Sequence, residues 1–264
     1  MLKSVIEWFA GKKRFQRIFE TLYRASLYGM NYGNGDVRQS GESYATQYVK
    51  SKISGQRRPV ILFDVGANQG KYTMRLASTF ADTEYRIHAF EPSKQISEAF
   101  SNNTKHLPNI TVHQFGLGAA AEHVTLHKRA ALSGHASVYN RRLQHFDMAL
   151  DIKEEIELKT LDQFCTEQGI DRIHFLKMDV EGHEWYCLQG AAGMIGKGAI
   201  DFIQFEFGGC NIDSRTFFQD FWYLLHDQYH FFRVLKDGLQ PIEAYNERLE
   251  IFKNINFLLQ RKSL

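Results

Sequence analysis

The stretch "ILFDVGANQGKYT", residues 61 to 73, joins a buried strand to a helix through a turn that contains two glycines. Its apolar run stops at Asp64, and Gly66 and Gly70 follow before helix-like residues begin. Glycines in such a turn let the backbone approach a ligand more closely than a side chain would allow. We therefore interpret this turn as the first candidate ligand site of the chain.

Strand-like and helix-like segments alternate on the carboxyl side of this turn. Apolar runs predict strands at residues 60–65, 86–92, 110–116, 173–180 and 201–208. Amphipathic segments predict helices near residues 71–80, 94–106, 161–168 and 184–195. This order is typical of an α/β fold, in which a mostly parallel sheet carries helices on both faces.

Two parts of the pattern are less regular. The section from 119 to 158 predicts a hairpin around residues 123–130. Near the end, apolar runs at 231–235 and 255–260 are joined by a segment with Gly238 and Pro241, which we expect to be a loop. These two runs predict an antiparallel addition to the sheet.

Residues 1–58 precede the first strand and are predicted to form an N-terminal helical extension, which caps a main domain at residues 59–264. Apolar recurrence predicts helix to about residue 30, and a glycine-rich loop follows at 28–44. The first helix mixes basic with aromatic residues, which leaves contact with an anionic membrane as the alternative to packing on the main domain. These residues are Lys12, Lys13, Arg14 and Arg17 with Trp8, Phe9, Phe15 and Phe19.

The composition is that of an ordinary globular protein of 264 residues, with 44% hydrophobic residues. Its formal charge of +2 creates no strong field toward nucleic acid. Its three cysteines lack the close spacing of a zinc site or a disulfide framework. Because neither a secretory signal nor a transmembrane stretch is apparent, we expect a cytoplasmic protein, and the oligomeric state stays unknown.

Acidic residues and glycines mark the carboxyl ends of the predicted strands, where open α/β sheets bind their ligands. They are Asp64, Glu91, Gly116, Gly118, Asp179, Glu181 and Glu206. The turn D-V-G-A-N-Q-G lacks the middle glycine of a dinucleotide-binding turn, and its carboxylate would repel a pyrophosphate. A cationic ligand such as S-adenosylmethionine suits it better, and Glu91 could accept hydrogen bonds from two ribose hydroxyls.

The joined motifs "FDVGANQGKYT", "AFEPS", "FLKMDVEGHEW" and "IQFEFG" resemble the FkbM-type methyltransferases, a branch of the class I S-adenosylmethionine-dependent enzymes. The resemblance spans about residues 59–210. It implies a Rossmann-like, seven-stranded sheet with an antiparallel last strand, and methyl transfer to a hydroxyl oxygen, often of a sugar or natural product.

The same resemblance implies roles for individual residues. Asp64, Gly66 and Asn68, with Gly70 in the same turn, would hold the amino-acid end of the cofactor. Glu91 would hold its ribose. The adenine would lie against Phe115, Gly116 and Leu117, and Ser137 and Asp179 would add further contacts with the cofactor.

The stretch "KMDVEGHEW", residues 177–185, supplies the candidate catalytic groups. Methyl transfer needs the acceptor, the methyl carbon and the sulfur in line, and an alcohol must also lose a proton. Asp179, Glu181 and His183 are the candidates for these tasks. No metal site is predicted, although Asp179 and Glu206 are weak candidates for oxygen ligands of a divalent ion.

Other functions are weighed against this hypothesis. A dehydrogenase would need the three-glycine turn, and a nucleic-acid methyltransferase would be expected to show a larger basic face. Methylation of an amine or a protein would use the same cofactor half. A module that binds S-adenosylmethionine without turnover would share the fold. We expect a small-molecule or glycan acceptor and no nucleic acid.

Overall fold

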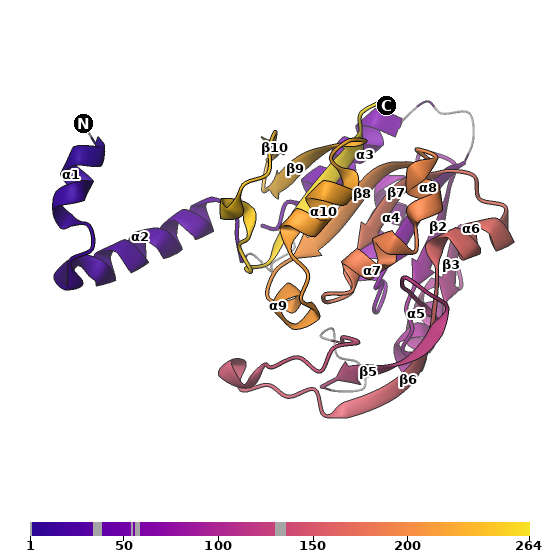
Figure 1. Cartoon of the computed structure of the whole chain (residues 1–264). Coiled ribbons are helices and arrows are strands. Elements are labelled where there is room, and N and C mark those ends of the chain that lie inside the picture. The colour runs from indigo at the N-terminus through magenta and orange to yellow at the C-terminus, as the bar shows by residue number, and fades with distance from the viewer. Residues whose placement is uncertain (1, 34–38, 54, 56–58, 130–135) are drawn as a thin grey trace.

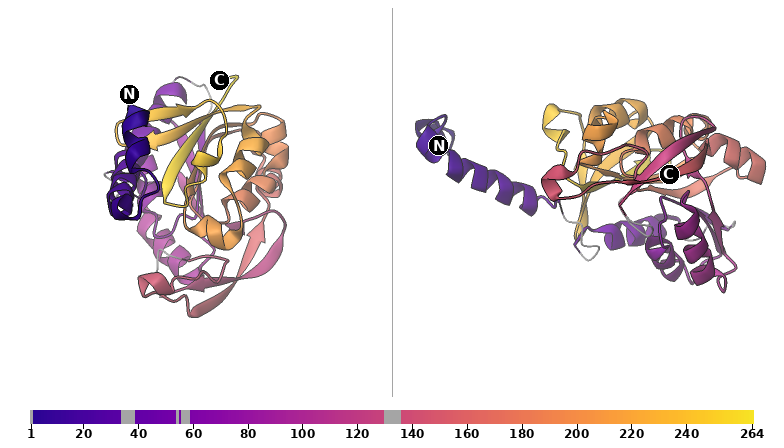
Figure 2. Two further views of the ribbon diagram at one scale, coloured as in Figure 1. Left: turned by 60° about the vertical axis from the view of Figure 1, so that its left-hand side comes forward. Right: turned by 90° about the horizontal axis from the view of Figure 1, so that it is seen from below.

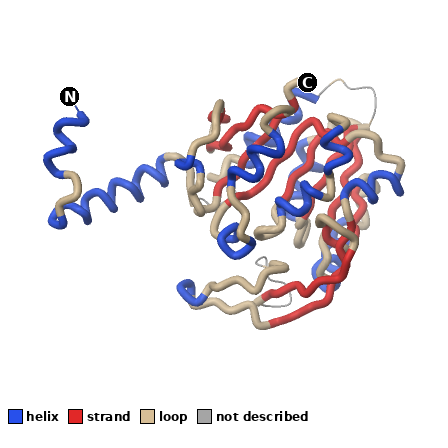
Figure 3. The backbone as a smooth tube through the Cα atoms, in the orientation of Figure 1, coloured by secondary structure: helices blue, strands red, loops and turns tan. Residues whose placement is uncertain are grey.

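The computed structural model describes residues 2–33, 39–53, 55, 59–129 and 136–264. Its centre is a sheet of eight strands in the order β10-β9-β11-β8-β7-β1-β2-β3. Helices lie on both faces of this sheet, so the body has three layers (Figures 1 and 3). The predicted α/β fold is confirmed, with eight strands in place of the expected seven.

The central sheet is mostly parallel. Its strands are β1 (Val60–Val65), β2 (Tyr85–Phe90), β3 (Ile110–His113), β7 (Ile173–Met178), β8 (Ile200–Phe207), β9 (Tyr229–Leu235), β10 (Gly238–Ile242) and β11 (Ile255–Arg261). β11 runs antiparallel between β8 and β9, so the predicted antiparallel addition is present. All six residues of β7 are buried, because a central parallel strand is covered on both faces, and this accounts for its mainly apolar sequence, interrupted by His174 and Lys177.

Two sets of helices cover the sheet. One face carries α3 (Glu42–Ile53), α4 (Lys71–Thr79) and α5 (Lys94–Thr104), and the other carries α6 (Leu161–Gln168), α7 (Glu184–Gln189), α8 (Ala192–Gly196) and α10 (Phe218–Leu225). Neighbouring residues of β1 divide between them, because side chains alternate along a strand. Leu62 packs in the cluster of α3 and α4, whereas Phe63 packs in the cluster of α6. Short helices complete the body: α9 (Cys210–Ser214), η2 (Gln144–Phe146) and η3 (Glu247–Leu249).

The eighth strand lies where the sequence predicted a loop. β10 contains both Gly238 and Pro241, and Pro241 lies opposite Phe232 of β9 in an antiparallel pair. Proline lacks an N–H group, but an edge strand tolerates it because one side of that strand needs no donor. β10 is the edge strand of the sheet, so this proline ends no pairing.

A separate three-stranded sheet has the order β4-β6-β5. It consists of β4 (Gly116–Leu117), β5 (Glu122–Lys128) and β6 (Ile152–Lys159). The predicted hairpin at 123–130 was wrong, because residues 122–128 form one strand that pairs with the distant β6. The predicted strand 110–116 likewise divides at His113, because Gly116 leaves the central sheet to pair with Leu158.

The N-terminal extension consists of two different parts. α1 (Leu2–Phe9), η1 (Lys13–Phe15) and α2 (Gln16–Gly29) form an arm that projects away from the body instead of capping it (Figures 1 and 2). By contrast, α3 buries Ala45, Val49 and Ile53 in the core against α4. The predicted boundary after residue 58 separates α3 from the layer to which it belongs, and residues 56–58 themselves lie outside the described part of the chain.

A buried charge cluster joins β7, β8 and β11 at the end of the sheet where β8 begins. Asp201 is fully buried, and its two carboxylate oxygens accept hydrogen bonds from Arg172 Nε at 2.9 Å and Nη2 at 2.7 Å. Arg261 Nε donates to the same carboxylate at 3.2 Å. One acid therefore pairs with two guanidinium groups from different segments.

We expect Asp201→Asn to lower the free energy of unfolding by about 2 kcal/mol, because both arginines lose their anionic partner, although Arg172 keeps some access to water. Denaturant unfolding measures the loss. Asp227→Asn is the control, since that side chain is 89% exposed, and it should change the stability by less than about 0.5 kcal/mol. Equal losses of unfolding free energy in the two variants would contradict a stabilising role for the pairing of Asp201 with the two arginines.

Candidate active site

The turn between β1 and α4 depends on glycine at two positions. Gly66 has a φ of 79°, and a Cβ atom there would lie 2.0 Å from the carbonyl oxygen of Asp179. Gly70 has a φ of 81°, and a Cβ atom there would lie 2.1 Å from the ring of Phe100. Asn68, between them, is also left-handed, with a φ of 49°. The first glycine brings two strand ends into backbone contact, and the second lets α5 pack against the turn.

Asp64 supports this turn from inside the protein. Its fully buried Oδ2 accepts a hydrogen bond of 2.6 Å from the hydroxyl of Thr73, and its Oδ1 lies 3.7 Å from Nζ of Lys177. Burial raises the pKa of Asp64, and the charge of Lys177 opposes that shift. Asp64 lines neither of the two cavities described below, so the structure places it behind the wall of the site.

The first cavity, here called the inner cavity, lies between the carboxyl ends of β1, β2 and β7 and the second sheet. Its walls are mainly apolar, with Leu126, Ile156 and Leu158 contributed by β5 and β6. Eight of the residues predicted for the site line it, namely Gly66, Asn68, Glu91, Gly116, Leu117, Asp179, Glu181 and His183. The fold thus brings together residues that are up to 117 positions apart in the sequence.

Glu91 is a nearly buried carboxylate in the wall of the inner cavity. Its Oε2 accepts a hydrogen bond from the N–H of Asn68 at 3.0 Å, and its Oε1 accepts one from the N–H of Ser93 at 2.9 Å. Each oxygen keeps a lone pair that a ligand hydroxyl could use. Burial raises the pKa of Glu91 to about 7, and the two N–H groups oppose that shift, so its charge varies near neutral pH.

His183 contributes an uncharged imidazole to the same wall. Burial lowers the pKa of His183 to about 4, and its ring stacks on that of Tyr186. Its Nδ1 lies 3.1 Å from the hydroxyl of Tyr139, whereas the buried Nε2 has no hydrogen-bond partner among the described residues. If the hydroxyl donates to Nδ1, the ring carries its hydrogen on Nε2 and can donate it to a ligand.

The loop after β7 has an unusual backbone that a buried acid stabilises. Glu181 and Gly182 are both left-handed, with φ of 52° and 106°. Glu184 accepts hydrogen bonds from the N–H groups of Val180 at 2.8 Å and of Gly182 at 3.0 Å. Burial raises the pKa of Glu184 to about 8. Glu184 lies in the stretch that was expected to supply catalytic groups, but its role in stabilising this turn was not predicted, although an acid two residues after a glycine has the spacing that such a turn requires.

The second cavity, here called the outer cavity, lies beside the same turn toward α3 and α4. It is lined by Glu42, Gly66, Ala67, Asn68, Gln69, Lys71, Tyr72, Arg75, Lys177 and Asp179. The two cavities therefore share Gly66, Asn68 and Asp179, so they adjoin at the carboxyl ends of β1 and β7. Glu42, Tyr72 and Arg75 were not predicted from the sequence. They lie on the helices α3 and α4, and no sequence motif marks the face of a helix that lines a cavity.

Lys177 is a buried cation beneath the junction of the two cavities. Its Nζ lies 3.2 Å from Asp179 Oδ2 and 4.7 Å from the centre of the Tyr72 ring. Burial by itself would lower the pKa of Lys177, but the charges of Asp179, Asp64 and Glu42 outweigh burial and raise it. The side chain of Asp179 is 40% exposed, so this carboxylate faces the cavities while the lysine holds it.

Five residues predicted for the site line neither cavity: Asp64, Gly70, Phe115, Ser137 and Glu206. Phe115 packs in an aromatic group with Phe90 and Phe164. Ser137 donates its hydroxyl hydrogen to the carbonyl oxygen of Glu181 at 2.8 Å, so it helps to position the loop after β7. These five residues therefore lie outside the linings of the inner and outer cavities.

The acids near the junction do not assemble into a recognisable metal centre. Glu181 pairs with Arg141, which also lies 3.4 Å from Asp213. Burial, with the charges of Asp179 and Glu181 added, raises the pKa of Glu206 well above its usual range. Within the described residues there is no group of three or more histidine, cysteine, aspartate or glutamate side chains that could hold a metal ion.

Comparisons with known proteins point to one family. The family model described as "Methyltransferase FkbM domain" matches residues 64–234. "Methyltransferase 1" of Beauveria bassiana is 25% identical over 144 residues, which cover 49% of this chain and 57% of the relative. "AMB antimetabolite synthetase AmbE" of Pseudomonas aeruginosa is 29% identical over 161 residues, which cover 49% of this chain and 8% of that protein.

The match therefore spans little more than half of the first curated relative and a small part of the second. Among solved structures, the methyltransferase FkbM from Methylobacillus flagellatus KT is 18% identical, with a TM-score of 0.47. The similarity covers 80% of this chain and 47% of that one.

We expect Gly66→Ala to lower the free energy of unfolding by about 2 kcal/mol or more, because it adds both backbone strain and a clash with the Asp179 carbonyl. Gly196→Ala is the matched control, since no atom lies within 4 Å of a Cβ atom there, and it should leave the stability unchanged or raise it by up to about 1 kcal/mol. Thermal and denaturant unfolding measure both variants. A neutral Gly66→Ala would contradict the close approach of the two strand ends.

Proposed function

The chain belongs to the FkbM methyltransferase domain family, and on this premise we propose that it transfers a methyl group from S-adenosylmethionine to a hydroxyl group of a sugar, glycan or natural-product acceptor. The single observation that carries the proposal is the junction of the inner and outer cavities at Gly66, Asn68 and Asp179. A ligand with an adenosine half and an amino-acid half needs two adjoining cavities of different chemistry.

The inner cavity fits the adenosine half. Its apolar walls suit a planar base, and the free lone pairs of Glu91 suit the two ribose hydroxyls. His183 Nε2 is a buried polar atom with no hydrogen-bond partner in the part of the chain that the structure describes, and a ring nitrogen of the base would supply one. Gly66 has no side chain, so the turn after β1 can contact the carbonyl oxygen of Asp179 after β7 in the wall of this cavity.

The outer cavity fits the amino-acid half. Lys71 and Arg75 offer positive charge for a carboxylate, and Glu42 and Asp179 offer negative charge for an ammonium group. Arg75 Nη1 lies 3.6 Å from Glu42, so the two signs of charge sit close together, as they do in an amino acid. We propose that Lys71, Arg75 and Glu42, with the backbone of Asn68, hold that end of the cofactor, and that Asp179 lies beside it.

S-adenosylmethionine, when bound, supplies an electrophilic methyl group on its sulfonium sulfur. The acceptor hydroxyl must then lose its proton, and Asp179 is the ionisable group that both cavities share. His183, with a pKa of about 4, is a weak base, and Glu181 is already paired with Arg141. Asp179 is also paired, with Lys177, but its side chain is 40% exposed whereas that of Glu181 is 15% exposed. We therefore propose that Asp179 accepts the proton and that Lys177 holds its carboxylate in position.

We expect the affinity for S-adenosylmethionine to depend on the ionisation of Glu91. Because the pKa of this buried carboxyl is about 7, protonation below that pH removes acceptors for the ribose hydroxyls. The dissociation constant should rise by up to about tenfold per pH unit as the pH falls below 7, and it should level off above 7.5 or so. Calorimetric titrations between pH 5.5 and 8.5 or thereabouts measure this profile.

The control for that experiment is Glu91→Gln, which should bind more weakly and show a flat profile. The same titratable group should also affect the free protein. Its folded-state pKa is raised above the unfolded value, so its contribution to stability is complete below about pH 4.5 and is lost as the pH rises through 7. An affinity that is independent of pH in the wild type would show that Glu91 does not bind the ribose.

Methyl transfer itself is tested by label transfer from S-adenosylmethionine carrying a radioactive methyl group, with separate panels of sugars, natural-product alcohols and amines. We expect transfer to alcohols. Asp179→Asn should lower kcat by about 100-fold or more while raising the dissociation constant of the cofactor much less. Transfer to amines alone would replace the proposal with N-methylation, and cofactor binding without transfer to any panel would favour a binding module.

A further inference from the structure

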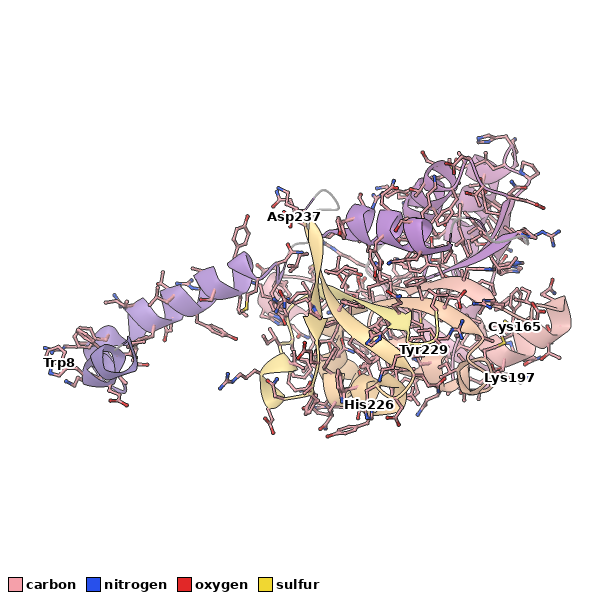
Figure 4. The ribbon with its side chains drawn as sticks, turned by 90° about the horizontal axis from the view of Figure 1, so that it is seen from above. Trp8, Cys165, Lys197, His226, Tyr229 and Asp237 are labelled. Atoms are coloured by element: carbon pink, nitrogen blue, oxygen red, sulfur yellow. The ribbon has the colours of Figure 1, made fainter. Side chains whose placement is uncertain are left out.

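The N-terminal arm, residues 2–29, makes almost no contact with the body of the protein. Among the described side chains, every one from Ile6 to Ser26 is exposed or half-buried, and that of Leu27 is the first to be buried. Trp8 stands at the far end of the arm, well away from the sheet (Figure 4). A helix that is stable in isolation is uncommon at this length, so the arm is expected to have a partner surface.

The longer helix of the arm has two chemically distinct faces. Ile18, Leu22 and Ala25 recur at the spacing that aligns them on one face of α2. The side chains of Ile18 and Leu22 are 55% and 56% exposed. Arg17 and Arg24 flank this face, about a third of a turn away, and Glu20 lies opposite it. An apolar face of this kind is normally covered, and no described part of the body covers it.

The far end of the arm combines aromatic rings with cations. The ring centre of Phe9 lies 4.8 Å from those of both Trp8 and Phe15, so the three rings form one group where α1 meets α2. Nζ of Lys12 lies 4.3 Å from the centre of the Trp8 ring, and the guanidinium of Arg14 lies 4.6 Å from that of Phe15. Aromatic rings with basic groups beside them are typical of the boundary between lipid head groups and acyl chains.

Charge separates the arm from the rest of the chain. Residues 1–30 contain six basic residues (Lys3, Lys12, Lys13, Arg14, Arg17 and Arg24) and two acidic ones (Glu7 and Glu20), a net charge of +4. The whole chain carries +2, so residues 31–264 carry −2. The positive charge is thus concentrated on the same short segment that exposes the apolar face.

We propose that this arm binds the surface of an anionic membrane, with the apolar face of α2 and the aromatic group in the interface and the basic residues among the head groups. The arm would lie on the bilayer, since no described helix is long and apolar enough to cross a membrane. Pairing with the arm of a second copy fits less well, because it would bring two segments of charge +4 together.

The root of the arm lies at the same end of the sheet as the cavities. The N–H of Gly33 donates to the carbonyl oxygen of Asn254 at 2.7 Å, and the side chain of Asn254 donates to Glu206 at the end of β8 at 3.3 Å. A docked arm would therefore bring the carboxyl ends of the strands toward the lipid surface. Membrane binding by the arm does not depend on the proposed methyl transfer, so either can fail without the other.

The test is sedimentation of the full chain with vesicles of phosphatidylcholine alone or with about 30% phosphatidylserine. We expect binding to the anionic vesicles that is at least about tenfold tighter than to the neutral ones and that weakens with added salt. The double variant Ile18→Asn with Leu22→Asn should weaken this binding by about tenfold or more. Glu20→Gln, on the polar face, is the matched control and should bind as tightly as the wild type or more tightly.

Melting temperatures separate binding from folding. Because the side chains of Ile18 and Leu22 do not pack on the body, the double variant should melt within about 2 °C of the wild type. Equal binding to both kinds of vesicle, or binding that the double variant retains, would overturn the proposal. A dimer in lipid-free solution that the double variant converts to a monomer would also overturn it, in favour of a second copy as the partner.

Discussion

The contact between the β1 turn and the β7 loop is the constraint on which the candidate site depends. Gly66 admits the carbonyl of Asp179 at a distance that no side chain would permit, and the N–H of Asp179 donates to the carbonyl oxygen of Val65 at 2.9 Å. Lys177 sits behind this contact, close to both Asp64 and Asp179. The two strand ends therefore act as one unit, and both cavities open from it. A change that separated them would alter the walls of both cavities together.

Acidic residues at the strand ends divide into distinct physical roles. Asp64 and Glu184 are fully buried and stabilise turns through hydrogen bonds, so their carboxylates are unavailable to a ligand. Glu91 and Asp179 lie in cavity walls and keep acceptor capacity. Glu181 is paired with Arg141. The site therefore uses several carboxylates, but few of them are free for chemistry, which is why the proposal rests on Asp179.

The sequence predicted those features that local motifs encode. Gly66, Asn68 and Glu91 were expected at strand ends and in one turn, and they do line one cavity, because turn geometry and strand ends are short-range properties. Their roles toward the cofactor stay predictions. The pairing of β5 with β6 was not predictable from periodicity, since the two strands are separated by 23 residues. Alternation of apolar and polar residues indicates a strand but not the strand with which it pairs. Ser137 was expected to contact the cofactor, but the same limit hid its contact with the carbonyl oxygen of Glu181, 44 residues away in the sequence. Pro241 suggested a loop, but it lies in the edge strand β10, which tolerates a residue that usually ends pairing.

The most direct test of the account is a crystal structure of the protein with S-adenosylhomocysteine, the product that methyl transfer from S-adenosylmethionine leaves behind. The account predicts adenosine in the inner cavity, with the ribose hydroxyls on Glu91, and the amino-acid group in the outer cavity beside Arg75 and Asp179. A folded protein whose crystals take up the ligand elsewhere, or fail to take it up at millimolar concentration, would contradict the assignment of the two adjoining cavities to one cofactor.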